Sequence, residues 1–394
     1  MRKLTLIQDL LRQQGLAGWL LYDFRGLNPI ARRLAPLPPH ALLTRRWAYW
    51  IPARGEPGWL VHAIEAGAFA DQAARVVTYS SWQSLAAALL RLTDGPQVIA
   101  CEYSPDGSIP YVSYVDAGTL ERWRRLGYEP VSSADLIQAV YATWSPEQLA
   151  SHRRAAAICL AVKDEAFAWI ARRLRRGQTV TEGEVQAFIH EGLTAAGLDP
   201  EHPPIVAVNA HAGDPHYSPH PERPTPIRPG DLILIDLWGR EAGNPEAVFA
   251  DITWMGYAGP EPPAALVAVF EVVARARDAA IALVQTRVAA GVAVAGWEVD
   301  DAARQVIVAA GYGPDFPHRT GHSLDTSIHG AGVNMDNLET HDTRRLIPGI
   351  GFTIEPGIYR PDFGIRLEID MFIHPDHAEV TTLPLQTAFI TMDV

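Results

Sequence analysis

The sequence predicts an α/β domain followed by an α+β domain, and three observations lead to this fold class. In the first third of the chain, short apolar runs that suit strands alternate with amphipathic stretches that suit helices. A strong helix start at residues 143–148 then opens a long segment rich in Ala, Leu and Arg. After residue 311, strand and turn patterns predominate. We therefore expect two domains, at residues 1–143 and 144–394.

The elements of the first domain follow from apolar spacing and turn residues. Expected strands alternate with expected helices along the chain, and this alternation predicts a partly parallel sheet. The expected strands are Gly18–Tyr22, Trp47–Ile51, Trp59–Val61 and Val98–Cys101, and the expected helices are Leu4–Gln14, Ile64–Ala74 and Ser81–Leu92.

The second domain begins with a capping box, in which Ser145 is the N-cap, Pro146 the first helical residue and Gln148 the reciprocal partner. The segments that follow are long helices, a Pro- and His-rich loop region, and then strands. The expected elements are helices to Arg176, over Thr181–Gly197, Ala264–Ala290 and Val299–Ala310, and strands at Asp231–Asp236, Gly351–Ile354, Gly364–Ile369, Glu379–Thr382 and Thr387–Met392.

Composition excludes several classes of function. The 394 residues are 48% hydrophobic and carry a net charge of −12, which argues against nucleic acid or an anionic membrane as a partner. The only cysteines, Cys101 and Cys159, cannot form a disulfide framework, so a cytoplasmic location is expected. No apolar run approaches the ~18–20 residues that span a bilayer.

Four carboxylates and one imidazole of the second domain stand in unusually apolar sequence, and an ionised carboxylate buried without a partner costs several kcal/mol. Divalent cations would compensate the buried charge of all four carboxylates at once. Two such ions would balance four carboxylates and leave room for a bridging hydroxide. Oxygen-rich ligation with one imidazole favours Mn²⁺, with Co²⁺ or Zn²⁺ as alternatives. The predicted ligands are Asp236, Asp251, His322, Glu355 and Glu368.

These residues stand in five motifs whose order resembles that of the pita-bread metallopeptidases, a family that includes methionine aminopeptidase, aminopeptidase P and Xaa-Pro dipeptidase (prolidase). A Pro-His216-Tyr217 segment is similar to the proline-specific branch. The motifs are Leu-Ile-Asp236, Asp251-Ile-Thr253, His318-x-x-Gly-His322 followed by His329, Ile-Glu355-Pro-Gly-Ile-Tyr359, and Gly-Ile-Arg366-Leu-Glu368. The resemblance implies a creatinase- and prolidase-like N-terminal domain and a pita-bread catalytic domain.

The resemblance also implies roles for individual residues. Asp236 would be a terminal ligand, Asp251 and Glu368 would bridge the two ions, and His322 and Glu355 would complete the second ion. Glu355 would also carry a proton from the attacking water to the leaving nitrogen.

The remaining implied roles concern the substrate. His329 and His216 would stabilise the tetrahedral intermediate, and His318 would lie in the pocket for the proline. Arg366 would orient neighbouring groups of the site.

The implied activity is hydrolysis of the Xaa–Pro bond by a metal-bridging hydroxide, preferentially in dipeptides. The partner would be a small peptide with proline in second position, and the protein would be a homodimer. Two alternatives stay open. One is an aminopeptidase P that acts on longer peptides. The other is a creatinase-like amidine hydrolase without metal, against which the retention of all five ligand types argues.

Several side chains have two interpretations at this stage. Either His216 or His220, four residues later, could be presented by the Pro-rich loop. Tyr359 suits a core aromatic with a polar tip as well as a site residue. His202 and His211 are expected to be solvated loop residues.

Overall fold

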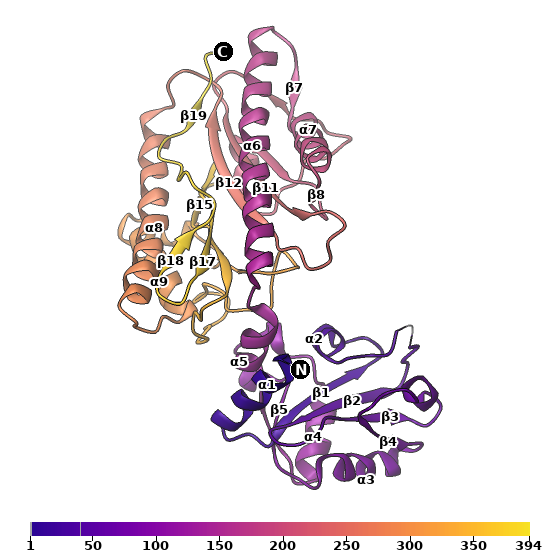
Figure 1. The fold of residues 1–394 in the computed structure, drawn as a ribbon. Helices are drawn as coiled ribbons and strands as arrows, with labels where there is room; N and C mark the ends of the chain where they lie inside the picture. The colour runs from indigo at the N-terminus through magenta and orange to yellow at the C-terminus, as the bar shows by residue number, and fades with distance from the viewer. Residues whose placement is uncertain (1, 40) are drawn as a thin grey trace. The chain divides into compact units, whose positions relative to one another are not determined.

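The computed structural model of the protein describes residues 2–39 and 41–394 and divides into two compact units (Figure 1). The first unit spans Met1–Tyr141 and the second Ala142–Val394. The domain boundary expected from the capping box lies two residues further along the chain, between residues 143 and 144. In the described part of the chain, no helix is both long and apolar enough to cross a membrane.

The first unit is built on a six-stranded mixed sheet. Its strand order is β4-β3-β2-β1-β5-β6. The pairs β3–β4, β1–β5 and β5–β6 are parallel and the other two pairs are antiparallel, as the alternation of strands and helices predicts. The strands are β1 (Gly18–Phe24), β2 (Arg46–Pro52), β3 (Gly58–His62), β4 (Arg75–Tyr79), β5 (Val98–Cys101) and β6 (Glu129–Ser132).

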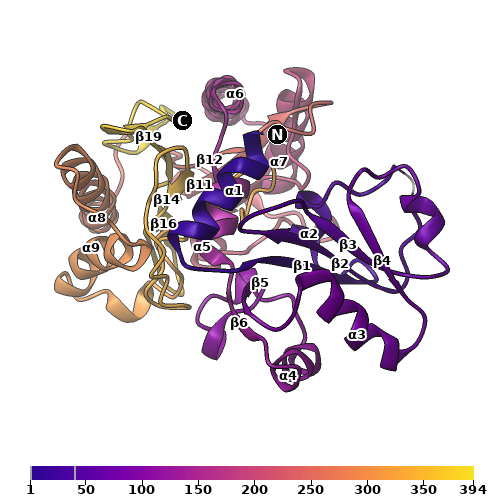
Figure 2. The ribbon, with the colours of Figure 1, turned by 60° about the horizontal axis from the view of Figure 1, so that its bottom comes forward.

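Helices α3 and α4 cover the same face of this sheet (Figure 2). The capping box of Ser81 and Ser84 starts α3, and the Asp116 side chain caps α4 by accepting from the backbone N–H of Thr119. The helices of the unit are α1 (Arg2–Gln13), α2 (Pro29–Leu34), α3 (Trp82–Thr93), α4 (Ala117–Arg125) and α5 (Ala134–Ile137), with short turns η1 (Ala66–Phe69), η2 (Pro105–Gly107) and η3 (Pro110–Val112) and the π-helical turn η4 (Gln138–Ala142).

The helix expected over Ile64–Ala74 is wrong. That segment forms only the 3₁₀ turn η1, followed by turns that lead into β4. Within η1 only Phe69 is buried, and Ile64 is 66% exposed. The apolar face that the spacing predicts is largely unburied here, since Ile64 is exposed, and a helix of this length is marginal without packing.

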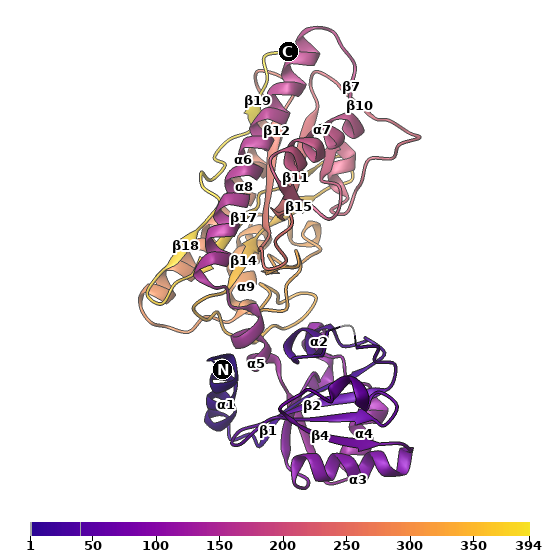
Figure 3. The same cartoon turned by 45° about the vertical axis from the view of Figure 1, so that its right-hand side comes forward.

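The second unit places two strands, β11 and β12, between two layers of helices. Helix α6 packs on both strands and on α7 (Figure 3). The elements up to β12 are α6 (Pro146–Arg175), β7 (Val180–Thr181), α7 (Glu182–Ala195), β8 (Leu198–Asp199), β9 (Ile205–Val208), η5 (Asn209–Gly213), β10 (Pro226–Ile227), β11 (Leu232–Glu241) and β12 (Ala250–Tyr257).

The rest of the unit combines the helix pair α8–α9 with a four-stranded sheet in the order β13-β14-β17-β18 and the hairpin β15–β16. Both helices bury apolar residues against these strands. The elements are α8 (Ala264–Ala289), α9 (Gly296–Ala309), η6 (Gly313–Asp315), β13 (Ser323–Leu324), β14 (Gly351–Ile354), β15 (Gly357–Tyr359), β16 (Gly364–Arg366), β17 (Ile369–Ile373), β18 (Ala378–Val380) and β19 (Ile390–Thr391).

Strand β11 buries both of its faces, and the alternation of its side chains decides which core each one enters. Ile233 and Ile235 pack with residues of α6 and α7. Leu232 and Leu234 point to the opposite face, into the core formed with α8 and α9. The next residue on that second face is Asp236, so a carboxylate continues an otherwise apolar row.

Candidate metal centre

The antiparallel pairing of β11 with β12 brings the first two predicted ligands to one face. Asp236 lies opposite Thr253, and Asp251 lies opposite Trp238. Directly opposed residues share a face, and so do residues two apart, so both carboxylates point the same way as diagonal neighbours. The spacing of 15 positions between them is accommodated by a hairpin loop, since Gly239 still pairs with Ala250.

Glu368 reaches the same face from the short segment between β16 and β17. Its backbone N–H donates to the Thr253 carbonyl at 3.2 Å. The Thr253 hydroxyl donates in turn to Glu368 Oε2 at 2.7 Å. Thr253 therefore fixes Glu368 beside Asp236 and Asp251.

His322 and Glu355 are positioned by the pairing of β13 with β14. The Thr353 hydroxyl accepts from the His322 backbone N–H at 3.0 Å and donates to Glu355 Oε1 at 3.1 Å. The Glu355 backbone N–H donates to the Thr320 carbonyl at 2.7 Å. One threonine thus holds both side chains at the site.

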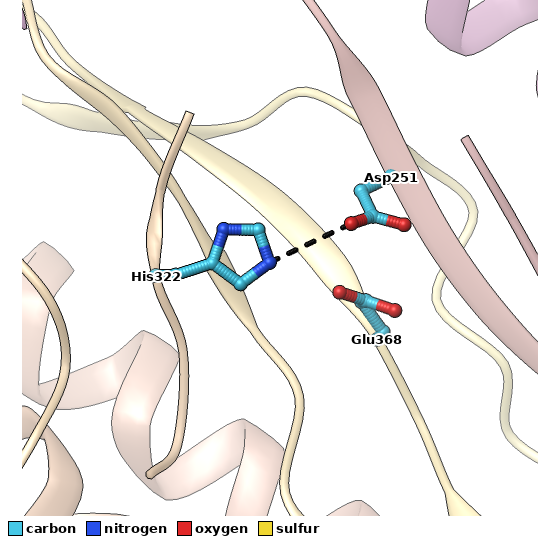
Figure 4. A group of neighbouring side chains, drawn as sticks. All are labelled: Asp251, His322 and Glu368. Atoms are coloured by element: carbon cyan, nitrogen blue, oxygen red, sulfur yellow. Dashed lines mark ion pairs between the residues drawn. The ribbon is translucent and has the colours of Figure 1, made fainter. Parts of the chain in front are cut away.

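The five predicted ligands converge in space. One ligand atom from each of Asp251, His322 and Glu368 lies within 4.8 Å of the other two (Figure 4). His322 Nε2 lies 3.6 Å from Asp251 Oδ2 and 3.4 Å from Glu355 Oε1. Asp236 lines the same cavity and completes the set.

The donor set fits divalent cations. His322 Nδ1 is 3.2 Å from the Ser323 carbonyl oxygen, an acceptor, so the proton belongs on Nδ1 and the Nε2 lone pair faces two carboxylates. Asp236 Oδ1 and Asp251 Oδ1 are buried without a hydrogen-bond partner. Lone pairs that converge without any donor are the arrangement that a cation satisfies.

Charge crowding leads to the same conclusion. Burial raises the pKa of Asp251 and of Glu368 well above the usual values, and the neighbouring carboxylates raise both further. Burial also raises the pKa of Asp236, against the lowering effect of the Arg366 guanidinium. Burial lowers the pKa of His322, which keeps its imidazole neutral and able to bind a metal. One guanidinium cannot neutralise four carboxylates.

Arg366 lies at the centre of a hydrogen-bonded chain beside the ligands. Its guanidinium donates to Asp236 Oδ2, to the Thr253 hydroxyl at 3.0 Å and to the Tyr359 hydroxyl at 3.2 Å. The Tyr359 hydroxyl is 2.8 Å from His318 Nε2, and His318 Nδ1 is 2.7 Å from the Arg319 carbonyl oxygen. Tyr359 therefore donates to His318, whose other nitrogen carries the proton.

Burial makes this chain neutral beyond the arginine. It lowers the pKa of His318 to about 3 and raises the pKa of Tyr359 to about 12. Both ring nitrogens of His318 are engaged, so this residue contributes a fixed, neutral wall to the cavity. Tyr359 is buried, and its hydroxyl contacts Arg366 and His318, so these contacts agree with a core aromatic whose polar tip supports two residues of the cavity wall.

A cavity of about 550 Å³ contains all nine predicted site residues. His216 lies on its wall, whereas the ring of His220 accepts from the backbone N–H of Glu222 outside the lining. The ring of His329 packs edge-on against His322 with centroids 4.4 Å apart. Proximity to His322 and burial lower the pKa of His329 to about 3, so its ring is neutral.

His202 is an exposed loop residue, as expected, and it also lines this cavity. His211 lies 3.0 Å from the buried Glu182, which also accepts from the Tyr217 hydroxyl at 2.6 Å. That contact ties down the loop that carries His216. His211 is therefore partly buried and bonded, and is no free loop residue.

Sequence reasoning missed other residues at the site. Arg319 and Glu339 line the cavity, and the Arg319 backbone N–H donates to Glu339 Oε1 at 3.0 Å. Behind the ligands, Asp370 Oδ2 accepts from the Asp251 backbone N–H at 2.9 Å. The position of Asp370, two residues after Glu368 on an apolar strand, was the available signal.

Comparison with known proteins agrees with this geometry. Residues 150–375 match the model of metallopeptidase family M24. A probable dipeptidase PepE of Mycobacterium tuberculosis is 29% identical over 254 residues, which cover 64% of this chain and 62% of that protein. A Xaa-Pro dipeptidase of Lactobacillus delbrueckii subsp. lactis is 30% identical over 210 residues, or 52% of this chain and 51% of that protein. The chain thus aligns with between half and two thirds of the length of these curated relatives.

A solved structure is similar over a greater length. The dipeptidase of Pyrococcus horikoshii OT3 superposes with a TM-score of 0.66 at 25% identity, covering 99% of this chain and 100% of that one. The fold is the pita-bread fold that the sequence motifs predict, preceded by an α/β unit.

Proposed function

The chain belongs to metallopeptidase family M24, and from that premise we propose that it hydrolyses the Xaa–Pro bond of dipeptides with two divalent cations bound. The convergence of Asp236, Asp251, His322, Glu355 and Glu368 in one cavity is the observation that carries this proposal. The Xaa-Pro dipeptidase and the dipeptidases among its relatives support the choice of substrate.

The five converging residues would hold the ions. When bound, two divalent cations lower the pKa of a water between them and polarise the substrate carbonyl. Glu355 is partly exposed to the cavity, and Thr353 holds its Oε1, so its carboxylate is oriented to accept the proton of the attacking water. The same carboxylate then returns the proton to the proline nitrogen as the bond breaks.

Two imidazoles assist at the carbonyl. His329, next to His322, and His216, on the opposite loop, present ring N–H groups where negative charge develops on the substrate oxygen. Arg366 holds Asp236 by its Oδ2, which leaves Oδ1 for an ion. The Tyr359–His318 contact keeps Arg366 from rotating away.

The finer features of this proposal rest on donor chemistry, on the cysteine content and on the family resemblance. The ions are Mn²⁺, because the donor set is rich in oxygen and contains one imidazole and no thiolate. The enzyme is a cytoplasmic homodimer, and its two described cysteines are buried and free, as a reducing compartment permits.

Two experiments test the proposal. Metal analysis of the purified protein should find about two divalent ions per chain, the number that balances four carboxylates. Turnover of Ala-Pro and Gly-Pro should stop after exhaustive chelation and return with Mn²⁺. Full activity of chelated, gel-filtered protein would instead support a metal-free hydrolase of the creatinase type.

Action on longer peptides is the second candidate, because a cavity of about 550 Å³ exceeds the size of a dipeptide. Rates on Ala-Pro and on Ala-Pro-Ala at equal concentration separate the two. A faster dipeptide supports the dipeptidase, and a faster tripeptide supports the aminopeptidase.

A further inference from the structure

The first unit contains a cavity of about 230 Å³ between its sheet and the helices α3 and α4. These helices lie on one face of the sheet, α3 beside β3 and β4 and α4 beside β6 (Figure 2). Leucines of both layers form the walls, whereas the residues that could fill the gap are small. The small residues are Ala48 on β2, Ala86 on α3 and Gly118 on α4. Arg46, Asp116 and Gly118 of its lining are exposed, so the cavity opens to solvent and a ligand can enter it.

One edge of the cavity is polar. Tyr22, Arg46 and Asp116 line it and also line a neighbouring cavity of about 240 Å³, so they stand where the two spaces meet. Asp116 accepts from the backbone N–H and the hydroxyl of Thr119, at 2.9 and 2.7 Å. Its orientation is therefore fixed by the start of α4.

The charged side chains of the lining sum to a positive charge. Two guanidinium groups, those of Arg46 and Arg122, and one carboxylate, that of Asp116, line the cavity. Arg122 is half-buried, and within residues 2–39 and 41–394 its guanidinium makes no hydrogen bond or ion pair. Burial raises the pKa of Tyr22, so its hydroxyl stays protonated. A half-buried guanidinium without a partner favours an anion in the cavity as its missing partner.

We propose that this cavity binds a small carboxylate with an apolar body, of the amino-acid class. The carboxylate lies on Arg122 and Arg46, and the branched or aromatic body lies among the leucines between α3 and the sheet. Asp116 is placed to receive an ammonium group, which would select a free amino acid over a simple carboxylic acid. The site uses none of the residues proposed for catalysis, so it stands or falls independently of the proposed function.

The packing supports an apolar body of defined shape. Leu60, Leu85 and Leu89 are buried side chains of the first unit's core, and Trp123 packs edge-on against Tyr22 with centroids 5.6 Å apart. Few polar side chains accompany these apolar walls, namely Tyr22, Arg46, Asp116, Thr119 and Arg122. That combination is typical of a small-molecule site.

Isothermal titration of the full-length, Mn²⁺-loaded protein tests the proposal with three probes. Phenylalanine and 3-phenylpropionate share the apolar body and the carboxylate, whereas phenylalaninamide lacks the carboxylate. We expect the two carboxylates to bind and the amide to bind at least about tenfold more weakly. If phenylalanine binds more tightly than 3-phenylpropionate, the ammonium group lies on Asp116 and the ligand is a free amino acid. If 3-phenylpropionate binds more tightly, the ligand is a simple carboxylic acid. Equal binding of the amide, or no binding of either carboxylate, overturns the proposal.

Two variants with matched controls locate the binding. Ala86→Phe fills the cavity from α3, whereas Ala87→Phe places the same ring on the exposed side of the helix. Arg122→Gln removes the unpaired cation, whereas Arg125→Gln removes an exposed arginine of the same helix. We expect about tenfold or greater loss of affinity in the first member of each pair only.

Arg122→Gln keeps the test decisive if Ala86→Phe does not fold, because it leaves the core unchanged. Circular dichroism of each variant reports folding. Affinity unchanged in both Ala86→Phe and Arg122→Gln would place the binding elsewhere, for example in the catalytic cavity, and would refute the site.

Discussion

Glu102 should make the stability of the first unit depend on pH in a way that can be calculated. Its carboxyl is fully buried and accepts from Trp19 Nε1 and Asn28 Nδ2, both at 2.7 Å, and from the Ser133 hydroxyl at 3.2 Å. Burial nevertheless outweighs these donors and raises the pKa of Glu102 to about 7. The ordinary pKa of an exposed glutamate is 4.5.

The sign of the effect follows from proton binding. Between the two pKa values the folded chain holds a proton that the unfolded chain has lost, so raising the pH favours unfolding in that window. Each pH unit changes the free energy of unfolding by about 1.4 kcal/mol. From about pH 5.5 to about pH 7.5, Glu102 should therefore lower stability by about 2 kcal/mol, and the effect should level off above pH 7.

Urea unfolding at these two pH values compares the parent with Glu102→Gln. The comparison isolates the contribution of Glu102 to the free energy of unfolding, because the contributions of all other titrating groups cancel. The parent should lose about 2 kcal/mol more than the variant on going to the higher pH. Glu129→Gln, at an exposed position of β6, serves as a control and should match the parent. Identical pH dependence in the parent and Glu102→Gln would refute the assigned burial cost.

Three further outcomes concern the metal centre. Glu355→Gln should fold and retain metal by elemental analysis but lose at least about a thousandfold in kcat, and near-parental turnover would remove its proton-transfer role. Added Mn²⁺ should raise the melting temperature of chelated protein, and Asp251→Asn should abolish most of that rise; an equal rise in both would contradict a preformed site. In chelated protein, Arg366→Gln should lower the free energy of unfolding by about 3–5 kcal/mol because it leaves Asp236 buried and unpaired. Arg360→Gln, which breaks a pair whose arginine is exposed, should lower the free energy of unfolding much less by the same urea measurement, and equal losses would show that the buried pair is not special.

The long elements of the second unit were predictable because each carries a local signal. The capping box at Ser145 and the Thr181–Glu184 pair start α6 and α7 where the sequence analysis places them. In the first unit the signals are weaker. Helix α4 was missed although Asp116 is a good N-cap and Leu120 and Trp123 have helical spacing, because the helix has only nine residues.

The wrong prediction of a helix over Ile64–Ala74 has the opposite cause to the missed α4, because here the local signal was present. The spacing there suits a helix, but β3 and β4 pair in parallel on either side of it, and the connection needs only a turn with one buried anchor, Phe69. The tertiary pairing of the strands overrode the local helical pattern, and this pairing cannot be predicted from the sequence of one segment alone.

The identity of the five predicted ligands could be predicted from local sequence, but their convergence in space could not. The register of the strand pairing decides whether these side chains meet. A shift of one residue in the β11–β12 pairing would turn Asp236 and Asp251 to opposite faces, and only the pairing of Asp236 with Thr253 excludes this. Thr253 then binds Glu368 through both its carbonyl and its hydroxyl, so the same register also sets the third carboxylate. A residue that binds no ion therefore determines the spacing of three that would, and its replacement should disturb metal binding without removing any ligand.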